Sequence, residues 1–270
     1  MATYKEIHGI NVQYRDSDAT AIEGDVWYNA STGLLKMYSG LGAWATGGAL
    51  NTARYAAGGF GIQTAAVMAA GDASPGNVGN VEEYDGSSWT EVTNITTTRR
   101  NLGTAGILTA GLGFGGRVGA TMTNANTEEY DGTNWTEVAD LNTGRRSSGS
   151  FGVQGAAFCV GGAGSSAYLD VVESWNSTSW TETTEYNTGR QDTGACGTTT
   201  AGLLVGGTSP AIVANTEIWD GSSWTEVGDL TTARTQMGTA GTSTFAMITG
   251  GTPAAVTKTE LWDGDRKSVV

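Results

Sequence analysis

The sequence predicts an all-β protein built from repeated four-stranded blades, and three features of the chain lead to this prediction. Glycine is abundant and proline rare, with 42 and 3 of the 270 residues, so the chain turns often without stiff linkers. A tryptophan recurs at intervals of 44 to 46 residues. Each interval contains four short runs of alternating apolar and small residues, separated by Gly, Asn, Asp and Ser. Such a period with four strands per copy is typical of a β-propeller blade.

Composition and charge narrow the classes of protein and partner. Charged residues make up 15% of the chain, too few for a helical protein, while nine Trp and nine Tyr supply a core that a disordered chain lacks. The net charge of -13 argues against nucleic acid and anionic membranes as partners. No run approaches about 18 consecutive apolar residues, so no membrane insertion is expected. Two cysteines and no signal peptide predict synthesis in a reducing cytoplasm.

The recurring tryptophan marks the outer strand of each blade, and a second aromatic residue precedes it by five or six positions. The tryptophans are Trp44, Trp89, Trp135, Trp180 and Trp224. The second aromatics are Tyr38, Tyr84, Tyr130, Trp175 and Trp219, and Trp262 begins a further copy. Rings that recur in nearly every copy are expected to fill the wedge between neighbouring blades, where each contributes about 1.5–3 kcal/mol. An aromatic surface that stacks sugars is the functional alternative.

One copy shows how the four strands follow one another. In the copy that begins at Arg145, the sequence predicts strands at about 149–153, 156–160, 171–175 and 180–183. The dipeptides Asp85-Gly86, Asp131-Gly132 and Asp220-Gly221 lie between two aromatic strands, where a tight hairpin needs them. Residues 41–270 are therefore assigned to the propeller, and residues 1–40 to an N-terminal attachment segment with a short β-module.

The number of blades stays open between five and six. The strand that contains Trp44 completes the blade begun by Arg234 if the propeller has five blades. Against this, residues 25–38 resemble two further strands joined to the Trp44 strand, and residues 265–270 are a candidate for a degenerate last strand. These segments favour six blades. Either number removes the free strand edges by closing the ring.

Each copy also carries one arginine and one glutamate at fixed positions. The arginines are Arg54, Arg99, Arg145, Arg190 and Arg234. The glutamates are Glu82, Glu128, Glu173, Glu217 and Glu260. One charge of each sign per blade predicts an Arg–carboxylate fork that ties adjacent loops. The alternative is a ring of guanidinium groups around the channel that binds an anionic ligand.

The segments that follow the glycine pair of each copy differ in length and chemistry while their flanks stay constant. Such loops on a rigid scaffold are where recognition is expected, although drift in unconstrained turns explains them equally well. The side chains best able to contact a glycan or protein there are Arg117, Asn124, Asn126 and Tyr168.

No enzymatic site is expected. The single histidine, His8, precedes the repeats, which excludes a Ser-His-Asp triad within the propeller and a histidine-rich metal site. A glycosidase would need two carboxylates, but no pair stands out from the repeated ones. Cys159 and Cys196 are interpreted as small core residues. The sequence thus predicts no catalytic residue, no cofactor and no bound metal.

The repeat resembles the kelch repeat. The glycine pair, the Glu-x-aromatic strand, the later Trp and the Arg of the next copy carry this resemblance over residues 41–264. The segments Gly24–Asn29 and Leu35–Tyr38 with Trp44 resemble the N-terminal module of tailed-phage fibre and virion proteins. Residues 1–7 and 51–54 are similar to kelch-type virion proteins of marine phages.

The phage resemblance implies a structural or adhesion role on a virion. Other virion proteins are then the expected partners, with several copies per particle and, as a further partner, a host-surface glycan or protein. The main alternative is a propeller specialised for receptor recognition. A glycosidase-type enzyme and a cytoplasmic kelch adaptor are weaker alternatives, and an adaptor would carry a companion domain.

Overall fold

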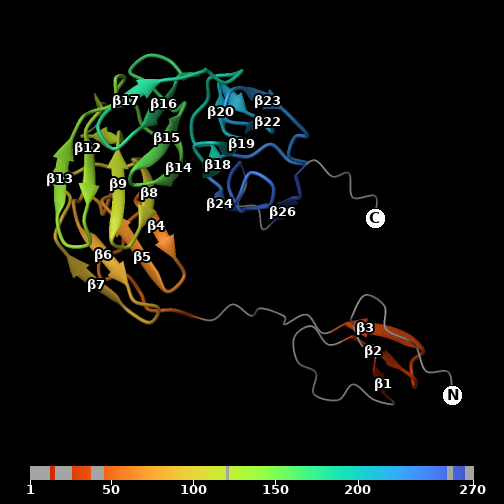
Figure 1. Ribbon diagram of the computed structural model, residues 1–270. Helices are drawn as coiled ribbons and strands as arrows, with labels where there is room; N and C mark the ends of the chain where they lie inside the picture. The colour runs from red at the N-terminus through yellow and green to blue at the C-terminus, as the bar shows by residue number, and fades with distance from the viewer. Residues whose placement is uncertain (1–12, 16–25, 38–45, 120–121, 254–257, 265–270) are drawn as a thin grey trace. The chain divides into compact units, whose positions relative to one another are not determined.

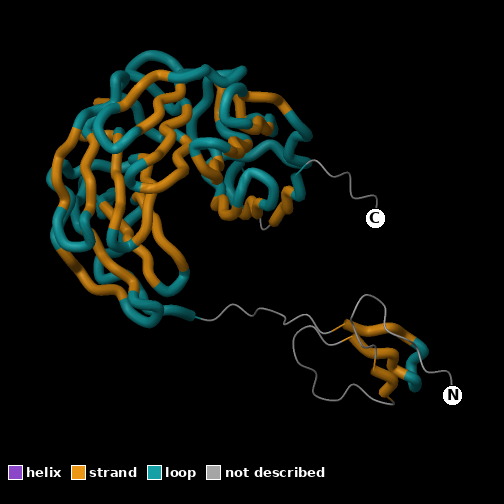
Figure 2. The backbone as a smooth tube through the Cα atoms, viewed as in Figure 1, coloured by secondary structure: helices purple, strands orange, loops and turns teal. Residues whose placement is uncertain are grey.

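Strands joined by turns and loops make up the described part of the chain, and no helix occurs in it (Figure 2). The computed structural model describes residues 13–15, 26–37, 46–119, 122–253 and 258–264. The chain divides into two units, Met1–Gly47 and Gly48–Val270.

The first unit contains one three-stranded sheet. Strand β1 (Gln13–Arg15) pairs in parallel with β2 (Val26–Asn29), which pairs antiparallel with β3 (Leu34–Met37). The β2–β3 turn is held by the Asn29 side chain, whose Oδ1 accepts hydrogen bonds from Ser31 Oγ at 2.7 Å and from the Thr32 amide at 3.0 Å. Trp27 is buried in this unit.

The second unit is a propeller of five blades, which succeed one another in chain order from β4 to β26 (Figure 1). Four blades are four-stranded antiparallel sheets in which the first strand lies innermost. Blade 1 contains β4 (Gly58–Ile62), β5 (Ala65–Ala69), β6 (Val81–Tyr84) and β7 (Trp89–Val92). Blade 2 contains β8 (Gly103–Ile107), β9 (Ala110–Phe114), β12 (Thr127–Tyr130) and β13 (Trp135–Val138). Blade 3 contains β14 (Gly149–Val153), β15 (Ala156–Val160), β16 (Val172–Trp175) and β17 (Trp180–Glu182). Blade 4 contains β18 (Gly194–Thr198), β19 (Ala201–Val205), β22 (Thr216–Trp219) and β23 (Trp224–Glu226).

Blade 5 has three strands in the described residues, β24 (Gly238–Gly241), β25 (Ala246–Thr249) and β26 (Thr259–Trp262). The predicted all-β propeller is therefore confirmed, and its blades number five. Of the segments that left the count open, residues 25–38 contain β2 and β3, which belong to the sheet of the first unit and not to a blade. Tyr38, Trp44 and residues 265–270 lie outside the described residues. Two short hairpins extend the loops of blades 2 and 4. They are β10 (Arg117–Val118) with β11 (Met122–Thr123), and β20 (Thr208–Ser209) with β21 (Ala211–Ile212).

The predicted Asp-Gly hairpins join the two outer strands of blades 1, 2 and 4. In each, the aspartate carboxylate accepts hydrogen bonds from the amides two and three residues later, and the glycine has a positive φ of 92° to 100°. The amide of Ser88, followed by the Ser87 groups, lowers the pKa of Asp85 to about 2, and Asp220 behaves alike. Asn176 makes the same contacts in blade 3 without a charge.

Aromatic side chains form the contacts between successive blades. We define the front face of a blade as the face directed towards the next blade in the chain, and the back face as the one directed towards the preceding blade. The Phe60 ring on the front of blade 1 meets Trp135 on the back of blade 2 edge-on, with centroids 6.3 Å apart. Trp180 packs on Phe114 at 4.8 Å and donates a hydrogen bond to Thr127 Oγ1 at 2.9 Å. The repeated rings thus form the inter-blade core.

The glycine pairs connect the backbones of adjacent blades. The amide of Gly116 donates to the carbonyl of Arg145 at 2.7 Å, and Gly162 and Gly207 make the same bond to Arg190 and Arg234. Gly116 has a φ of 104°, and a Cβ there would lie 2.9 Å from the Arg100 carbonyl oxygen. This close approach of two backbones is why the position is glycine.

Candidate functional site

Each repeated arginine forms an ion pair with the repeated glutamate of its own blade. The N–O distances are 2.9 Å for Arg54–Glu82, 3.2 Å for Arg99–Glu128, 2.5 Å for Arg145–Glu173 and 2.7 Å for Arg190–Glu217. Arg234 pairs with Glu260 in the same way. The side chains of all five arginines are fully buried. Burial lowers the pKa of Arg99, and the charge of Glu128 opposes that effect.

Blade 3 shows that each member of the pair also holds backbone. Arg145 donates from Nη1 to the carbonyl of Val171 at 2.7 Å and from Nε to that of Thr143 at 3.1 Å. Glu173 accepts from the amides of Asn142 and Thr143 at 2.7 and 3.2 Å. These contacts fix the segment that links blade 2 to blade 3. The guanidinium groups are committed to the framework and do not present a ring of charges to an anion.

The four predicted loop contacts fall into two groups. Asn124 is buried, and its Oδ1 accepts the Asn126 amide at 2.7 Å. Asn126 donates to Glu137 at 2.7 Å, a contact that Asn80 and Asn215 repeat with Glu91 and Glu226. Asn126 is therefore a framework position. Arg117 lies half-buried on β10, while Tyr168 has an exposed fraction of 38%.

The loop that carries Tyr168 borders two open cavities. One, of about 310 Å³, is lined by Arg146 and the loop residues from Ala163 to Tyr168. The other, of about 370 Å³, lies against Thr123 and the segment Asn142–Gly144. Tyr168 and this loop therefore remain accessible to a ligand, whereas Asn124 and Asn126 are held by the protein itself.

A larger polar cavity of about 490 Å³ lies where the chain enters the innermost strands. Its lining includes the residue two positions after each repeated arginine: Ala56, Asn101, Ser147, Asp192 and Gln236. All five have a left-handed backbone, with φ between 52° and 56°. Left-handed residues other than glycine are uncommon and gather at functional sites. Tyr55, 60% exposed, lies at the edge of this cavity. We call this cavity the mouth site.

The five mouth residues are connected through their backbones. The amide of each mouth residue after Ala56 donates to the carbonyl of the mouth residue of the preceding blade, at distances of 2.8 to 3.1 Å. These bonds run from Gln236 through Asp192, Ser147 and Asn101 to Ala56. Their backbones are thus fixed while their side chains differ from blade to blade. The side-chain amides of Asn101 and Gln236 make no hydrogen bond within the described residues, so they are available to a ligand.

Residue types and loop lengths alone do not predict the mouth site. The signal for it is a position that varies between copies, as Ala, Asn, Ser, Asp and Gln, at a constant distance from an invariant arginine. That contrast separates a variable surface residue from the framework around it.

Asp192 carries the carboxylate of the mouth site. Burial raises its pKa, while a hydrogen bond from Ser147 and the charge of Arg146 oppose the shift. A raised pKa means that the ionised form is less favourable in the folded chain than in the unfolded one, so the stability cost is present above the folded pKa and disappears below the unfolded value.

We therefore expect Asp192→Asn to raise the melting temperature at pH 7, because the variant carries no charge to bury. The gain should shrink as the pH is lowered from 7 through the folded pKa of Asp192, where the wild type binds its proton. Thermal unfolding of both proteins across this pH range measures the effect. A gain that is constant with pH would contradict the burial of the charge.

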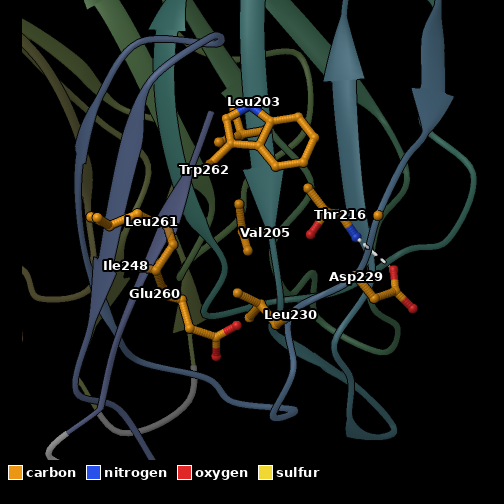
Figure 3. A pocket seen from close by; sticks show the side chains of 10 residues that line it. Leu203, Val205, Thr216, Asp229, Leu230, Ile248, Glu260, Leu261 and Trp262 are labelled. Atoms are coloured by element: carbon orange, nitrogen blue, oxygen red, sulfur yellow. Dashed lines mark hydrogen bonds between the residues drawn. The ribbon is translucent and has the colours of Figure 1, made fainter. Parts of the chain in front are cut away.

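A small gap of about 60 Å³ lies between blades 4 and 5, among Leu203, Val205, Leu230, Ile248 and Trp262 (Figure 3). At the three preceding interfaces, an outer-strand tryptophan covers the residue equivalent to Leu230. The described part of blade 5 has no outer strand to supply that ring. The gap is therefore a packing feature and not a ligand site.

Neither a metal-binding cluster in the described residues nor a similar curated protein was found. Within the described ranges, no three His, Cys, Asp or Glu side chains lie close enough together to hold a metal ion. Nor does that part of the chain contain a helix long and apolar enough to cross a membrane. No protein-family model matches the chain, and no curated protein matches it.

Proposed function

We propose that this chain is a non-enzymatic structural protein of a tailed-phage virion, in which the propeller presents a recognition surface. The observation that carries the proposal is the contrast between a repeated, buried Arg–Glu framework and a polar mouth whose side chains differ from blade to blade. A rigid scaffold with variable surface groups suits display better than catalysis. Immunogold labelling of purified virions with antibodies against the chain tests the location, and unlabelled particles would refute it.

Residues 1–40 are proposed as the attachment segment that binds other virion proteins. They resemble the N-terminal module of phage fibre proteins and lack the full blade repeat. In this proposal several copies of the propeller are mounted on each particle through this segment.

Deleting residues 1–22 should abolish incorporation into particles while leaving the propeller folded, because the blades begin after residue 47. Western blotting of purified particles and circular dichroism of the isolated variant measure the two properties. Incorporation at the wild-type level would place the attachment surface elsewhere.

A host-surface glycan is the proposed ligand of the recognition surface. Amide and carboxylate side chains at the mouth site match the donor and acceptor pattern of sugar hydroxyls, and the exposed Tyr55 ring supplies an apolar face beside them. Glycan-array binding should be lost in Asn101→Ala. The matched control is Asn134→Ala, which removes an exposed amide from the β12–β13 turn. Equal binding by both variants would remove the mouth site from the proposal.

The post-glycine loops are the second part of the recognition surface. Replacing residues 163–170 by residues 208–214 should preserve folding, because both segments connect the second and third strands of a blade and end at equivalent places. The carbonyls of the next residues, Val171 and Asn215, accept from the amides of Gly161 and Gly206 at 3.0 and 2.9 Å. Adsorption to host cells should change, since the swap removes Tyr168. Unchanged adsorption in all such swaps would leave only an assembly role.

A further inference from the structure

The front face of blade 5 is exposed and apolar. Ala240, Met247 and Leu261 lie side by side on adjacent strands, in the register Ala240–Met247 and Met247–Leu261. Leu261 is 79% exposed and the nearby Phe245 is 63% exposed. Together these four side chains line an open hollow of about 360 Å³. The described residues leave this face without a packing partner.

The same face is an inter-blade interface in the other four blades. The residues equivalent to Met247 are Val67, Leu112, Phe158 and Leu203, with exposed fractions of 0% to 3%. Each packs against the aromatic back face of the blade that follows. Blade 5 therefore presents a surface of a kind that this fold otherwise buries.

The back face of blade 1 is the second uncovered surface. The rings of Tyr84 and Trp89 pack against each other there, with centroids 5.0 Å apart and planes tilted by 34°, and both residues are half-buried. The equivalent rings of blades 2, 3 and 4 have exposed fractions of 0% to 8%. Ala66, which lies opposite Tyr84 in the sheet, is also only half-buried. Among the described residues, one front face, that of blade 5, and one back face, that of blade 1, thus have no packing partner.

The sizes of two facing residues are matched at every inter-blade contact. The first of these residues is the third residue of the innermost strand, on the front face of one blade. The second lies on the back face of the next blade, in its second strand, opposite the aromatic residue of the third strand. The pairs are Phe60 with Gly111, Ala105 with Ala157, Phe151 with Gly202 and Cys196 with Ala246. A Cβ at Gly111 or Gly202 would overlap the phenylalanine ring. A phenylalanine on the front face therefore requires glycine at the facing position of the next blade, whereas alanine or cysteine on the front face is paired with alanine there.

The two free faces satisfy this rule with each other. The front residue of blade 5 is Ala240 and the back residue of blade 1 is Ala66, a small–small pair like Ala105 and Ala157. A phenylalanine at position 240, as at position 60 or 151, would not fit against Ala66.

The series of backbone hydrogen bonds at the mouth site also leaves one free acceptor at blade 5 and one free donor at blade 1 in the described part of the chain. The bonds that run from Gln236 to Ala56 leave the Gln236 carbonyl and the Ala56 amide without such a partner in the described part of the chain. The innermost strands β4, β8, β14, β18 and β24 contact one another in order, but no comparable contact joins β24 to β4 (Figure 1).

We propose that the front face of blade 5 binds the back face of blade 1 of a second copy of this chain. The contact continues the inter-blade interface across two molecules, with the same aromatic-on-apolar packing and the same residue sizes. Because opposite faces meet, the association is head-to-tail and adds further copies in one direction unless the assembly closes on itself. This inference does not depend on a phage origin.

Variants of the full chain with one introduced cysteine each test the contact. Ala66→Cys and Ala240→Cys are mixed and treated with a short bismaleimide. A cross-linked product of twice the chain mass should form at least fivefold more than with either variant alone. The native Cys159 and Cys196 are buried, and the wild type controls for their reaction. Mixing Ala66→Cys with Ile107→Cys is the matched control, because Ile107 is 53% exposed at a strand tip. A double variant whose two cysteines are linked within one chain would overturn the proposal, since the ends would then close in the monomer.

Sedimentation velocity supplies a second test that does not depend on cysteine chemistry. The wild type should associate with rising concentration, and Leu261→Glu should weaken this association at least tenfold without changing the melting temperature. Ile107→Glu, which charges another exposed apolar residue, should leave association unchanged. A wild type that stays monomeric up to its solubility limit, or equal effects of the two substitutions, would overturn the proposal.

Discussion

Replacing Arg145 by alanine is expected to lower the free energy of unfolding by about 3–5 kcal/mol, because it leaves the Glu173 carboxylate buried without its partner. The substitution also removes the donors to the carbonyls of Val171 and Thr143. These bonds hold the link between blades 2 and 3, so the loss should appear as a lower urea midpoint for the propeller. Urea unfolding followed by tryptophan fluorescence measures it.

The adjacent Arg146 is the matched control. Its side chain is partly exposed and forms no ion pair within 4 Å in the described residues, so Arg146→Ala should cost no more than about 0–1 kcal/mol. Equal losses in the two variants would contradict a framework role for the buried pair. Lost ligand binding in Arg145→Ala with an unchanged midpoint would instead favour the anion-binding ring.

Trp180→Ala is expected to destabilise the propeller by about 3–5 kcal/mol, since the substitution leaves a cavity between blades 2 and 3. The indole is 5% exposed, packs on Phe114 and Trp175, and donates its Nε1 hydrogen to Thr127. Removing it breaks both the packing and the polar link between the two blades. Urea unfolding again measures the change.

Trp89 occupies the same repeat position in blade 1 and provides the control. It is half-buried because no blade of the described chain packs on that back face. Trp89→Ala should therefore cost clearly less than Trp180→Ala in dilute protein. A loss as large as that of Trp180→Ala in a monomeric sample would show that the back face of blade 1 is covered within the chain.

The sequence was sufficient to predict the blades because the repeat compares five copies within one chain. In blade 3 the predicted strands 149–153 and 156–160 agree with β14 and β15, and the two outer strands differ by one residue at an end. Periodicity, hairpin glycines and aromatic spacing are local signals, and they determine a blade. Local signals do not determine the number of blades, because this number depends on the angle between successive sheets.

The candidate site was harder to predict for a physical reason. Loop length and side-chain type indicated Asn124 and Asn126 as ligand contacts, yet Asn124 is buried and the Asn126 side chain is held by Glu137. The mouth residues were missed because a left-handed φ at Asn101 or Asp192 leaves no mark on composition. Their proximity arises only when five blades are assembled around one axis.

The size rule at the blade contacts has a consequence for how such a chain gains or loses repeats during evolution. Blades 1 and 3 combine a phenylalanine front with an alanine back, whereas blade 2 combines an alanine front with a glycine back. Deleting blade 2 alone would set Phe60 against Ala157, and duplicating it would set Ala105 against glycine. Removing two consecutive blades, or copying two consecutive blades among blades 1 to 4, keeps every pair matched. The heritable module of this propeller is therefore the pair of blades, about 90 residues long.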